Sequence, residues 1–145
     1  MMLSAILKNK PANVISVDPE TSITQVVKLL GEKRIGAVLV IDALDKLVGI
    51  LSERDIVRTL NTHAAATLSM TAAQLMTHSP TVTSPEATVV DAMQVMTDGR
   101  FRHLPVVSNG KLVGLVSIGD VVKARIDQQA HEVDSLRAYV VGAVA

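Results

Sequence analysis

The chain has no cysteine and no tryptophan among its 145 residues, and Phe101 and Tyr139 are its only aromatic residues. The absence of cysteine excludes disulfide bonds and thiolate chemistry. Because aromatic side chains are so scarce, the hydrophobic core must be built from Val, Leu, Ile, Ala and Met. The same scarcity excludes a platform on which nucleic-acid bases could stack.

Net charge and long apolar runs are absent as well. The 14 Lys and Arg residues balance 14 Asp and Glu residues, so the chain has no general attraction to nucleic acids or anionic lipids. No apolar run approaches the ~20 residues of a membrane span. The N-terminal segment lacks the basic leader and the long apolar stretch of a signal peptide. We therefore expect a cytoplasmic protein that binds neither membranes nor nucleic acids.

Catalytic and metal-binding patterns are also missing. Without cysteine, and with His63, His78 and His131 dispersed over linker and helix-surface positions, no residues have the spacing of a metal site. No Gly-x-x-x-x-Gly-Lys phosphate loop occurs. Ser52 and Ser117 have no neighbouring base that would activate them as nucleophiles. These absences predict that the protein is not an enzyme.

One phrase occurs twice in the chain. Residues 46–57 read KLVGILSERDIV, and residues 111–122 read KLVGLVSIGDVV. Upstream, Arg34 matches Arg100 at nearly the same offset. The duplicated unit has about 50 residues, which is too few to bury a sizeable core alone, so two copies are expected to pack together.

Each copy predicts a strand followed by a helix. Short β-branched stretches at residues 14–17 and 81–83 are each followed by a proline that ends them. Ser22 and Thr88 then begin helices, because a Gln or an Asp three residues later completes the spacing of a capping box.

The ends of these two helices each carry a glycine and an arginine. Gly31 and Gly99 lie near the helix ends, where glycine relieves the backbone. Arg34 and Arg100 follow, where a cation complements the negative end of the helix dipole. We expect these arginines to close helices rather than to bind a ligand.

A hairpin and a second helix complete each copy. Short apolar runs are typical of strands that are buried on both faces, and Asn109-Gly110 is a strong hairpin signal between two of them. The four strands are expected at residues 36–41, 47–51, 103–107 and 112–116. A helix is expected after each Ser-x-x-Asp motif.

The sequence thus predicts an α+β fold in which two β-α-β-β-α copies pack around a pseudo-two-fold axis. We place the first copy at residues 8–62, the second at 75–127 and a helical extension at 128–145, with a linker between the copies. Thr71-x-x-Gln74 predicts one capped helical turn after this linker. The apolar pattern of the last helix continues past the second copy, and we expect a second subunit to cover it.

Ser52-x-x-Asp55 and Ser117-x-x-Asp120 stand where a strand runs into a helix. One interpretation is structural: the pair forms a capping box that contributes roughly 1 kcal/mol and needs no ligand. The other is a ribose-phosphate clasp, in which the carboxylate accepts hydrogen bonds from a ribose diol and the helix N-terminus attracts a phosphate. The glycine three residues before each Ser favours the clasp, because glycine in a strand permits close approach to the backbone.

The repeated KLVG strand with its Ser-x-x-Asp motif, and His103-Leu-Pro-Val-Val before the second copy, resemble the CBS domain first described in cystathionine β-synthase. Two such domains in tandem form a Bateman module, and the resemblance covers about residues 8–127. It implies two clefts that bind adenine nucleotides or related adenosyl ligands, with Asp on the ribose and Ser near the ribose and phosphate. It also implies a standalone sensor that acts through an oligomer or a separate partner.

The resemblance implies two sites, each completed by the partner repeat. The first combines Ser52, Asp55, Pro80, Thr81, Phe101, Arg102 and His103. The second combines Ser117, Asp120, Val14, Ile15, Ile35, Gly36 and Ala37. Arg58 and Lys123, three residues after each Asp, are candidates for phosphate contacts. Because repeat two offers Arg-His where repeat one offers Gly-Ala, we expect the two sites to differ in affinity or in ligand.

The expected function is that of a homodimeric module that senses AMP, ADP, ATP or an NAD-type dinucleotide. Such a module takes part in signal transduction through an unknown effector protein, with no catalytic cofactor. Two alternatives stay open: a structural or interaction protein with vestigial clefts, and a binder of S-adenosylmethionine.

Overall fold

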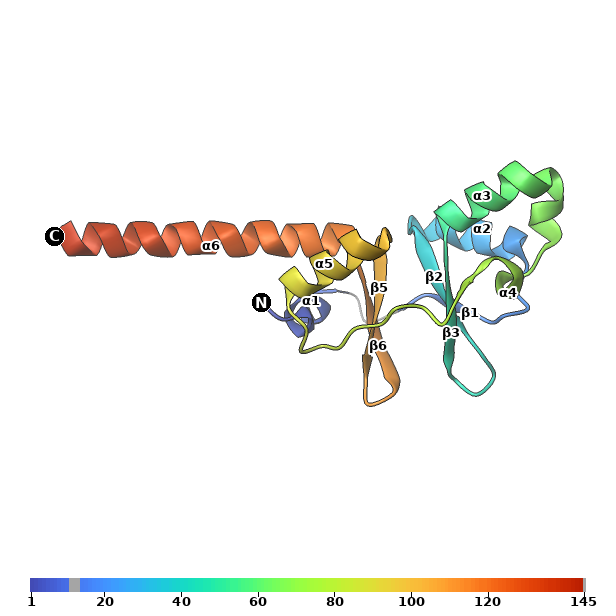
Figure 1. The fold of residues 1–145 in the computed structure, drawn as a ribbon, viewed down its shortest axis with the longest axis horizontal. Coiled ribbons are helices and arrows are strands. Elements are labelled where there is room, and N and C mark those ends of the chain that lie inside the picture. The colour runs from blue at the N-terminus through green and yellow to red at the C-terminus, as the bar shows by residue number, and fades with distance from the viewer. Residues whose placement is uncertain (11–13, 145) are drawn as a thin grey trace. The chain divides into compact units, whose positions relative to one another are not determined.

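The chain forms two compact units in a computed structural model that describes residues 1–10 and 14–144 (Figure 1). The repeat-one unit is Asn13–Thr81, and the repeat-two unit combines Met1–Ala12 with Val82–Ala145. Each unit contains helices and sheet, which confirms the predicted α+β class. None of the described helices is both long and apolar enough to cross a membrane.

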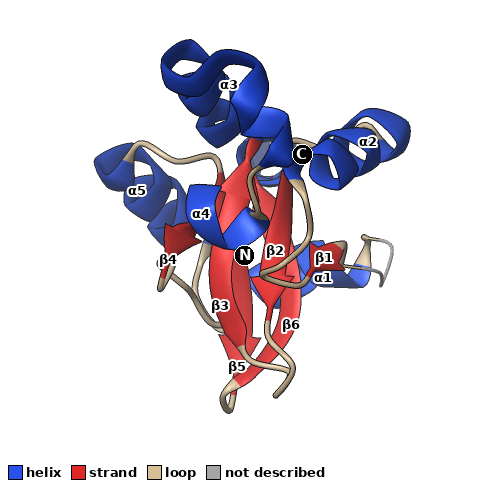
Figure 2. Cartoon of the chain, turned by 90° about the vertical axis from the view of Figure 1, so that its right-hand side faces the viewer, coloured by secondary structure: helices blue, strands red, loops and turns tan. Residues whose placement is uncertain are grey.

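The repeat-one unit contains a four-stranded sheet. Its strands are β1 (Ser16–Val17), β2 (Ala37–Ile41), β3 (Leu47–Ser52) and β4 (Thr77–His78), in the order β1-β2-β3-β4. β1 runs parallel to β2, whereas β2 and β3, and β3 and β4, pair antiparallel. Figure 2 shows β2 and β3 as the long central pair. The expected strands 36–41 and 47–51 are confirmed, and β4 is an addition that the sequence pattern did not predict.

Helices pack against this sheet and close its core. They are α2 (Ile23–Lys33), α3 (Glu53–His63), the 3-10 helix η1 (Ala64–Ser69) and α4 (Ala72–Leu75). Ile23 and Val26 of α2 and Ile56 of α3 are buried with strand residues in one apolar cluster, and burial of each such side chain stabilises the fold by about 1.5–3 kcal/mol. The expected linker is largely helical instead, because its alanines favour helix. Thr71 and Gln74 form the predicted capping box of α4.

The repeat-two unit contains α1 (Leu3–Lys8), α5 (Val89–Gly99), β5 (His103–Ser108), β6 (Lys111–Ser117) and α6 (Ile118–Val144). The predicted hairpin is confirmed: Asn109 (φ 53°) and Gly110 (φ 76°) both have positive φ, as a type I′ turn requires. The predicted strand 81–83 is wrong, since only Thr83 forms an isolated parallel bridge, to Val106. Prolines on either side of this segment cannot donate backbone hydrogen bonds, which limits the pairing.

At the ends of α2 and α5 the arginines have the expected place, but the glycines do not have the expected role. Arg34 (φ 53°) and Arg100 (φ 55°) are the left-handed C-cap residues of α2 and α5, so both arginines close helices as predicted. The glycines do not supply the left-handed backbone, because Gly31 and Gly99 lie within the helices. At Gly99 the ring of Phe101 occupies the space that a Cβ would fill, so packing accounts for this glycine.

Each unit is completed by the segment that precedes the other repeat in the sequence. Met2, just before α1, forms an antiparallel bridge to Thr88, the N-cap of α5. In the same way Thr71, just before α4, bridges Ser22, the N-cap of α2. α1 and α4 therefore have equivalent places in the two units.

Candidate functional site: two Ser-Asp motifs

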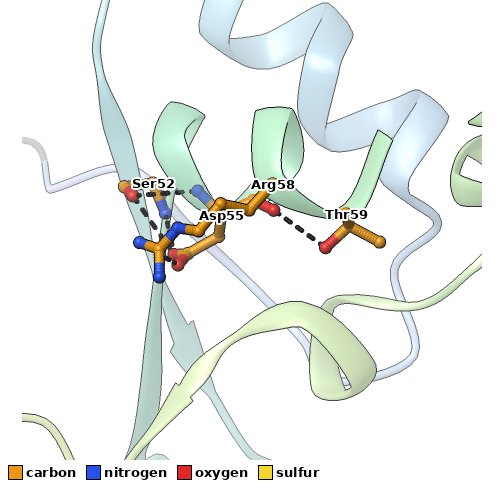
Figure 3. Close-up of polar contacts among 4 residues, drawn as sticks. All are labelled: Ser52, Asp55, Arg58 and Thr59. Atoms are coloured by element: carbon orange, nitrogen blue, oxygen red, sulfur yellow. Dashed lines mark hydrogen bonds and ion pairs between the residues drawn. The ribbon is translucent and has the colours of Figure 1, made fainter. Parts of the chain in front are cut away.

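Both Ser-x-x-Asp motifs lie at the step from a strand into a helix. Ser52 ends β3, its backbone N–H donates to Asp55 Oδ2 at 2.8 Å, and the N–H of Asp55 donates to Ser52 Oγ at 3.4 Å (Figure 3). Ser117 ends β6 and pairs with Asp120 through the equivalent bonds of 2.8 and 3.1 Å. The structural interpretation is therefore confirmed: each pair is a formed capping box. The ribose clasp stays a prediction.

The carboxylate oxygen Oδ1 of Asp55 has few contacts within the described part of the chain. Ser52 uses Oδ2 through both its N–H and its hydroxyl, at 2.8 and 3.1 Å. Oδ1 faces Arg58 Nη2 at 3.5 Å, and the Arg58 side chain is 76% exposed (Figure 3). The hydroxyl of Thr59 donates to the backbone carbonyl of Asp55, not to its carboxylate. Oδ1 therefore has lone pairs to offer a hydroxyl donor, with an exposed cation beside it.

Asp120 is held by a cation from another part of the chain. Lys10 Nζ lies 2.6 Å from Asp120 Oδ2 and donates to the carbonyl of Leu115 at 2.8 Å. The two side chains are 33% and 24% exposed. Burial alone would raise the pKa of Asp120, but hydrogen bonds from Lys10 and Ser117 and the charge of Lys10 outweigh it and lower the pKa below its usual value. The carboxylate of this motif is thus neutralised by the chain itself.

Lys10 is a residue that the sequence analysis missed. It lies in the segment before the first repeat, 110 residues from Asp120, and no local pattern marks it. In the repeat-one unit, Ser79 has the corresponding place after β4, and its N–H donates to Val48 O. The two motifs consequently differ in the cation beside the carboxylate: Lys10 lies 2.6 Å from Asp120, whereas Arg58 lies 3.5 Å from Asp55.

The corner before each hairpin lies beside the motif of its own unit. In the repeat-two unit His103 pairs with Ser117 across the hairpin, and the N–H of Ile118 donates to Arg102 O at 2.8 Å. The repeat-one unit repeats this arrangement: Ala37 pairs with Ser52, and Glu53 N–H donates to Gly36 O at 2.9 Å. The combination of Ser52 and Asp55 with the corner of the other repeat stays a prediction.

The other predicted site residues belong to the same elements or adjoin them. Val14 and Ile15 precede β1, and Pro80 and Thr81 follow β4. Ile15, Ile35 and Phe101 pack against the apolar cores, so part of each side chain is used by the fold. Lys123 is exposed on α6, one turn beyond Asp120.

The glycine before each motif has a structural explanation. A Cβ at Gly49 would meet the side chain of Met76, and a Cβ at Gly114 would meet Leu7 Cδ2 at 2.6 Å. The close approach to the backbone is therefore made by the chain's own side chains. These glycines do not favour a ligand over a capping role, contrary to the sequence argument.

The chain is similar to known proteins in sequence and in fold. Among curated proteins, the CBS domain-containing protein CBSX3, mitochondrial, of Arabidopsis thaliana is 36% identical over 128 residues, which are 85% of this chain and 62% of that relative. The chain thus spans less than two thirds of that relative's length. Among solved structures, the CBS-domain protein ATU1752 of Agrobacterium tumefaciens has 40% identity and a TM-score of 0.83, covering 86% of this chain and 92% of that chain.

A further solved structure holds a ligand. CBSX2 of Arabidopsis thaliana in complex with AMP has 29% identity and a TM-score of 0.73, covering 87% of this chain and 97% of that chain. The model of the CBS domain matches residues 7–62 and 72–127. The chain therefore belongs to the CBS-domain family and consists of two CBS domains in tandem, a Bateman module.

Proposed function

We propose that this chain is a regulatory module that binds adenine nucleotides at its two Ser-Asp motifs. The observation that carries the proposal is the duplicated geometry: a carboxylate and a serine hydroxyl held together at the N-terminus of a helix, twice. The AMP complex of a related CBS protein supports the ligand class. AMP, ADP, ATP and NAD-type dinucleotides share the adenosine that such a motif would recognise.

Each motif offers complementary groups to a nucleotide. Asp55 Oδ1 would accept from a ribose hydroxyl, because Ser52 engages mainly the other oxygen. The first N–H groups of α3 and the dipole of the helix favour a phosphate nearby. Arg58, exposed and one turn along, would add a charged contact to the phosphate. Ser117, Asp120 and Lys123 have the same roles at the start of α6.

The two sites are expected to bind unequally. At Asp120 the charge of Lys10, whose Nζ lies 2.6 Å from Oδ2, weakens the carboxylate as an acceptor for a ribose hydroxyl. Asp55 has only the longer contact to Arg58. We also retain the proposal that Arg102 and His103 strengthen phosphate binding at the Ser52–Asp55 site from the partner repeat. Both arguments make the Ser52–Asp55 site the tighter one.

The module would act without chemistry of its own. Among the described residues, no three His, Asp or Glu side chains gather as a metal site, and CBS pairs are in general regulatory. We propose a homodimer in which nucleotide binding shifts a conformational equilibrium that a separate effector reads, as in signal transduction. A cytoplasmic location stays a prediction, and the relative CBSX3 is described as mitochondrial.

A structural role with vestigial clefts is the competing function. It is favoured by the formed capping boxes and by the glycines, both of which the fold itself explains. Binding of S-adenosylmethionine is a third outcome, because this molecule also carries an adenosine.

Thermal unfolding in the presence of ligands separates these functions. We expect AMP, ADP, ATP or NAD at millimolar concentration to raise the Tm by several degrees, because a ligand that binds only the folded state stabilises it. GMP and inorganic phosphate serve as controls for nonspecific anion effects. S-adenosylmethionine is tested in parallel. If no adenosine compound raises the Tm more than these controls do, the sensing function is wrong and the structural role stands.

A further inference from the structure

The distal half of α6 has no packing partner in its own unit. The helix projects well beyond α5 and α1 (Figure 1), and every residue from 129 to 142 is exposed. Val133, Leu136 and Val140 are 48%, 63% and 52% exposed. Helices in proteins gain most of their stability from packing of an apolar face. This part of α6 therefore requires a cover.

The apolar residues of α6 follow a heptad pattern. Its seam positions are separated by alternate steps of four and three residues, which is the a/d spacing of a coiled coil. The seam consists of Val122, Ile126, Gln129, Val133, Leu136 and Val140. From residue 127 to residue 138 the opposite face, by contrast, holds polar or small residues. These are Asp127, Gln128, His131, Asp134, Ser135 and Ala138. The two valines of that face lie outside this stretch: Val121 is buried in the core of its own unit, and Val141 is exposed.

The side chains at the seam favour two parallel helices. Ile126, Val133 and Val140 occupy the a positions and are all β-branched, whereas Leu136 occupies a d position. β-branched residues at a with Leu at d favour a parallel two-stranded coiled coil. Gln129, at d, would meet the same residue of a second copy, and a single polar layer of this kind fixes the register.

The flanking charges match a second copy of the same chain. Glu132 is a g residue and Arg137 is the e residue of the next heptad. In a parallel pair these two positions face each other across the interface, so Glu132 would face the partner's Arg137, twice by symmetry. Within the described residues, neither side chain has an ion-pair partner in its own chain. An antiparallel pair would bring g to g and e to e, and would lose this match.

We propose that α6 pairs with α6 of a second copy as a parallel, in-register coiled coil over residues 122–140. The proposal specifies the interface of the homodimer in the proposed function and does not depend on nucleotide binding. α6 begins directly after Ser117, so the coiled coil is continuous with the second Ser-Asp motif. A ligand there would act on the helix that joins the two subunits.

An introduced cysteine tests the register directly, because the chain has none of its own. Val140→Cys places a thiol at an a position, where parallel in-register helices bring the two copies within disulfide distance. Ala138→Cys, two residues away on the outward face, is the matched control. Under mild oxidation we expect the full-length Val140→Cys protein to form a linked dimer on a non-reducing gel, and Ala138→Cys to remain largely unlinked.

Sedimentation equilibrium of the cysteine-free chain completes the test. We expect the wild type to be a dimer. In the double variant Val133→Asp/Leu136→Asp the Kd of the dimer should rise at least tenfold, and circular dichroism checks that this variant is folded. A monomeric wild type would overturn the proposal. So would a dimer whose Val140→Cys form links no better than the control, because its interface would be antiparallel or elsewhere. Nucleotide binding measured on the same samples keeps this result separate from the proposed function.

Discussion

At the scale of single residues, Lys10 distinguishes two motifs that are otherwise alike. Ser52–Asp55 and Ser117–Asp120 have the same backbone hydrogen bonds. Only Asp120 receives a short contact from a lysine, which lowers its pKa even though burial alone would raise it. Because a carboxylate with a close cation is a poorer acceptor for a ribose hydroxyl, we expect this one lysine to make the Ser117–Asp120 site the weaker of the two proposed sites.

The contact between Lys10 and Asp120 predicts a pH-dependent stability. A carboxyl whose pKa is lower in the folded state stabilises the fold above its unfolded pKa, and this contribution is lost as the pH falls through the folded pKa. We expect Lys10→Met to lower the free energy of unfolding by about 1 kcal/mol near pH 7. The deficit relative to the wild type should shrink as the pH falls below 3.8. Urea denaturation between pH 7 and pH 2 measures it.

Lys8→Met is the matched control for this experiment. Lys8 is the last residue of α1, two residues before Lys10, and is exposed; it has no ion-pair partner among the described residues. Its replacement should leave the pH profile unchanged. A Lys10→Met deficit that stays constant down to pH 2 would show that lost packing, not the charge pair, is responsible.

The motif residues could be predicted from the sequence, whereas Lys10 could not. Ser52 and Asp55 could be predicted because a capping box depends on side chains three residues apart. Lys10 could not, because it meets Asp120 across 110 residues through packing of α1 against β6. The role of the glycines was misjudged for a similar reason: their close neighbours, Met76 and Leu7, come from distant segments.

At the scale of elements, η1 is a helical segment where the sequence pattern predicted a linker, and its packing explains the difference. Its Ala-rich start follows directly on α3, and its own residue Thr67 is fully buried. The Thr67 hydroxyl has no hydrogen-bond partner among the described residues. A nearby threonine, Thr24 of α2, donates instead to the carbonyl of Leu68 at 2.8 Å, which ties α2 to η1.

We predict that replacing each of these two threonines with valine changes the free energy of unfolding in opposite directions. Thr67→Val keeps the shape of the side chain and removes an unsatisfied buried hydroxyl, so it should raise the free energy of unfolding by about 1 kcal/mol. Thr24→Val removes a formed hydrogen bond and should lower it by about 0.5–1 kcal/mol. Chemical denaturation of both variants measures the difference. If Thr67→Val is the more destabilising, the hydroxyl must have a partner and the packing of η1 has been misinterpreted.

At the scale of the whole molecule, the two repeats exchange their leading segments. α1 completes the core of the repeat-two unit, and α4 completes that of the repeat-one unit. The duplicated phrase, the capping boxes and the Asn109-Gly110 turn are local, and they sufficed to predict the order of most elements. The sequence did not predict which unit each leading segment packs against. The two repeats have the same apolar pattern, so each offers an equivalent surface to α1 and to α4.

Calorimetric titration with AMP tests most directly our proposal that this module has two unequal nucleotide sites, one built on Asp55 and the other on Asp120. Asn in place of Asp keeps an acceptor for the helix cap but removes the charge. Asp91→Asn is the control, because Thr88 and Asp91 form the same kind of capping box at the start of a different helix, α5, with bonds of 3.2 and 3.0 Å.

We predict two binding steps of different affinity for the wild type and for Asp91→Asn. Asp55→Asn should lose the tighter step and Asp120→Asn the weaker one, each by at least tenfold in Kd. Two identical sites in the wild type, or variants at Asp55 and Asp120 that bind AMP like the Asp91 control, would contradict the account.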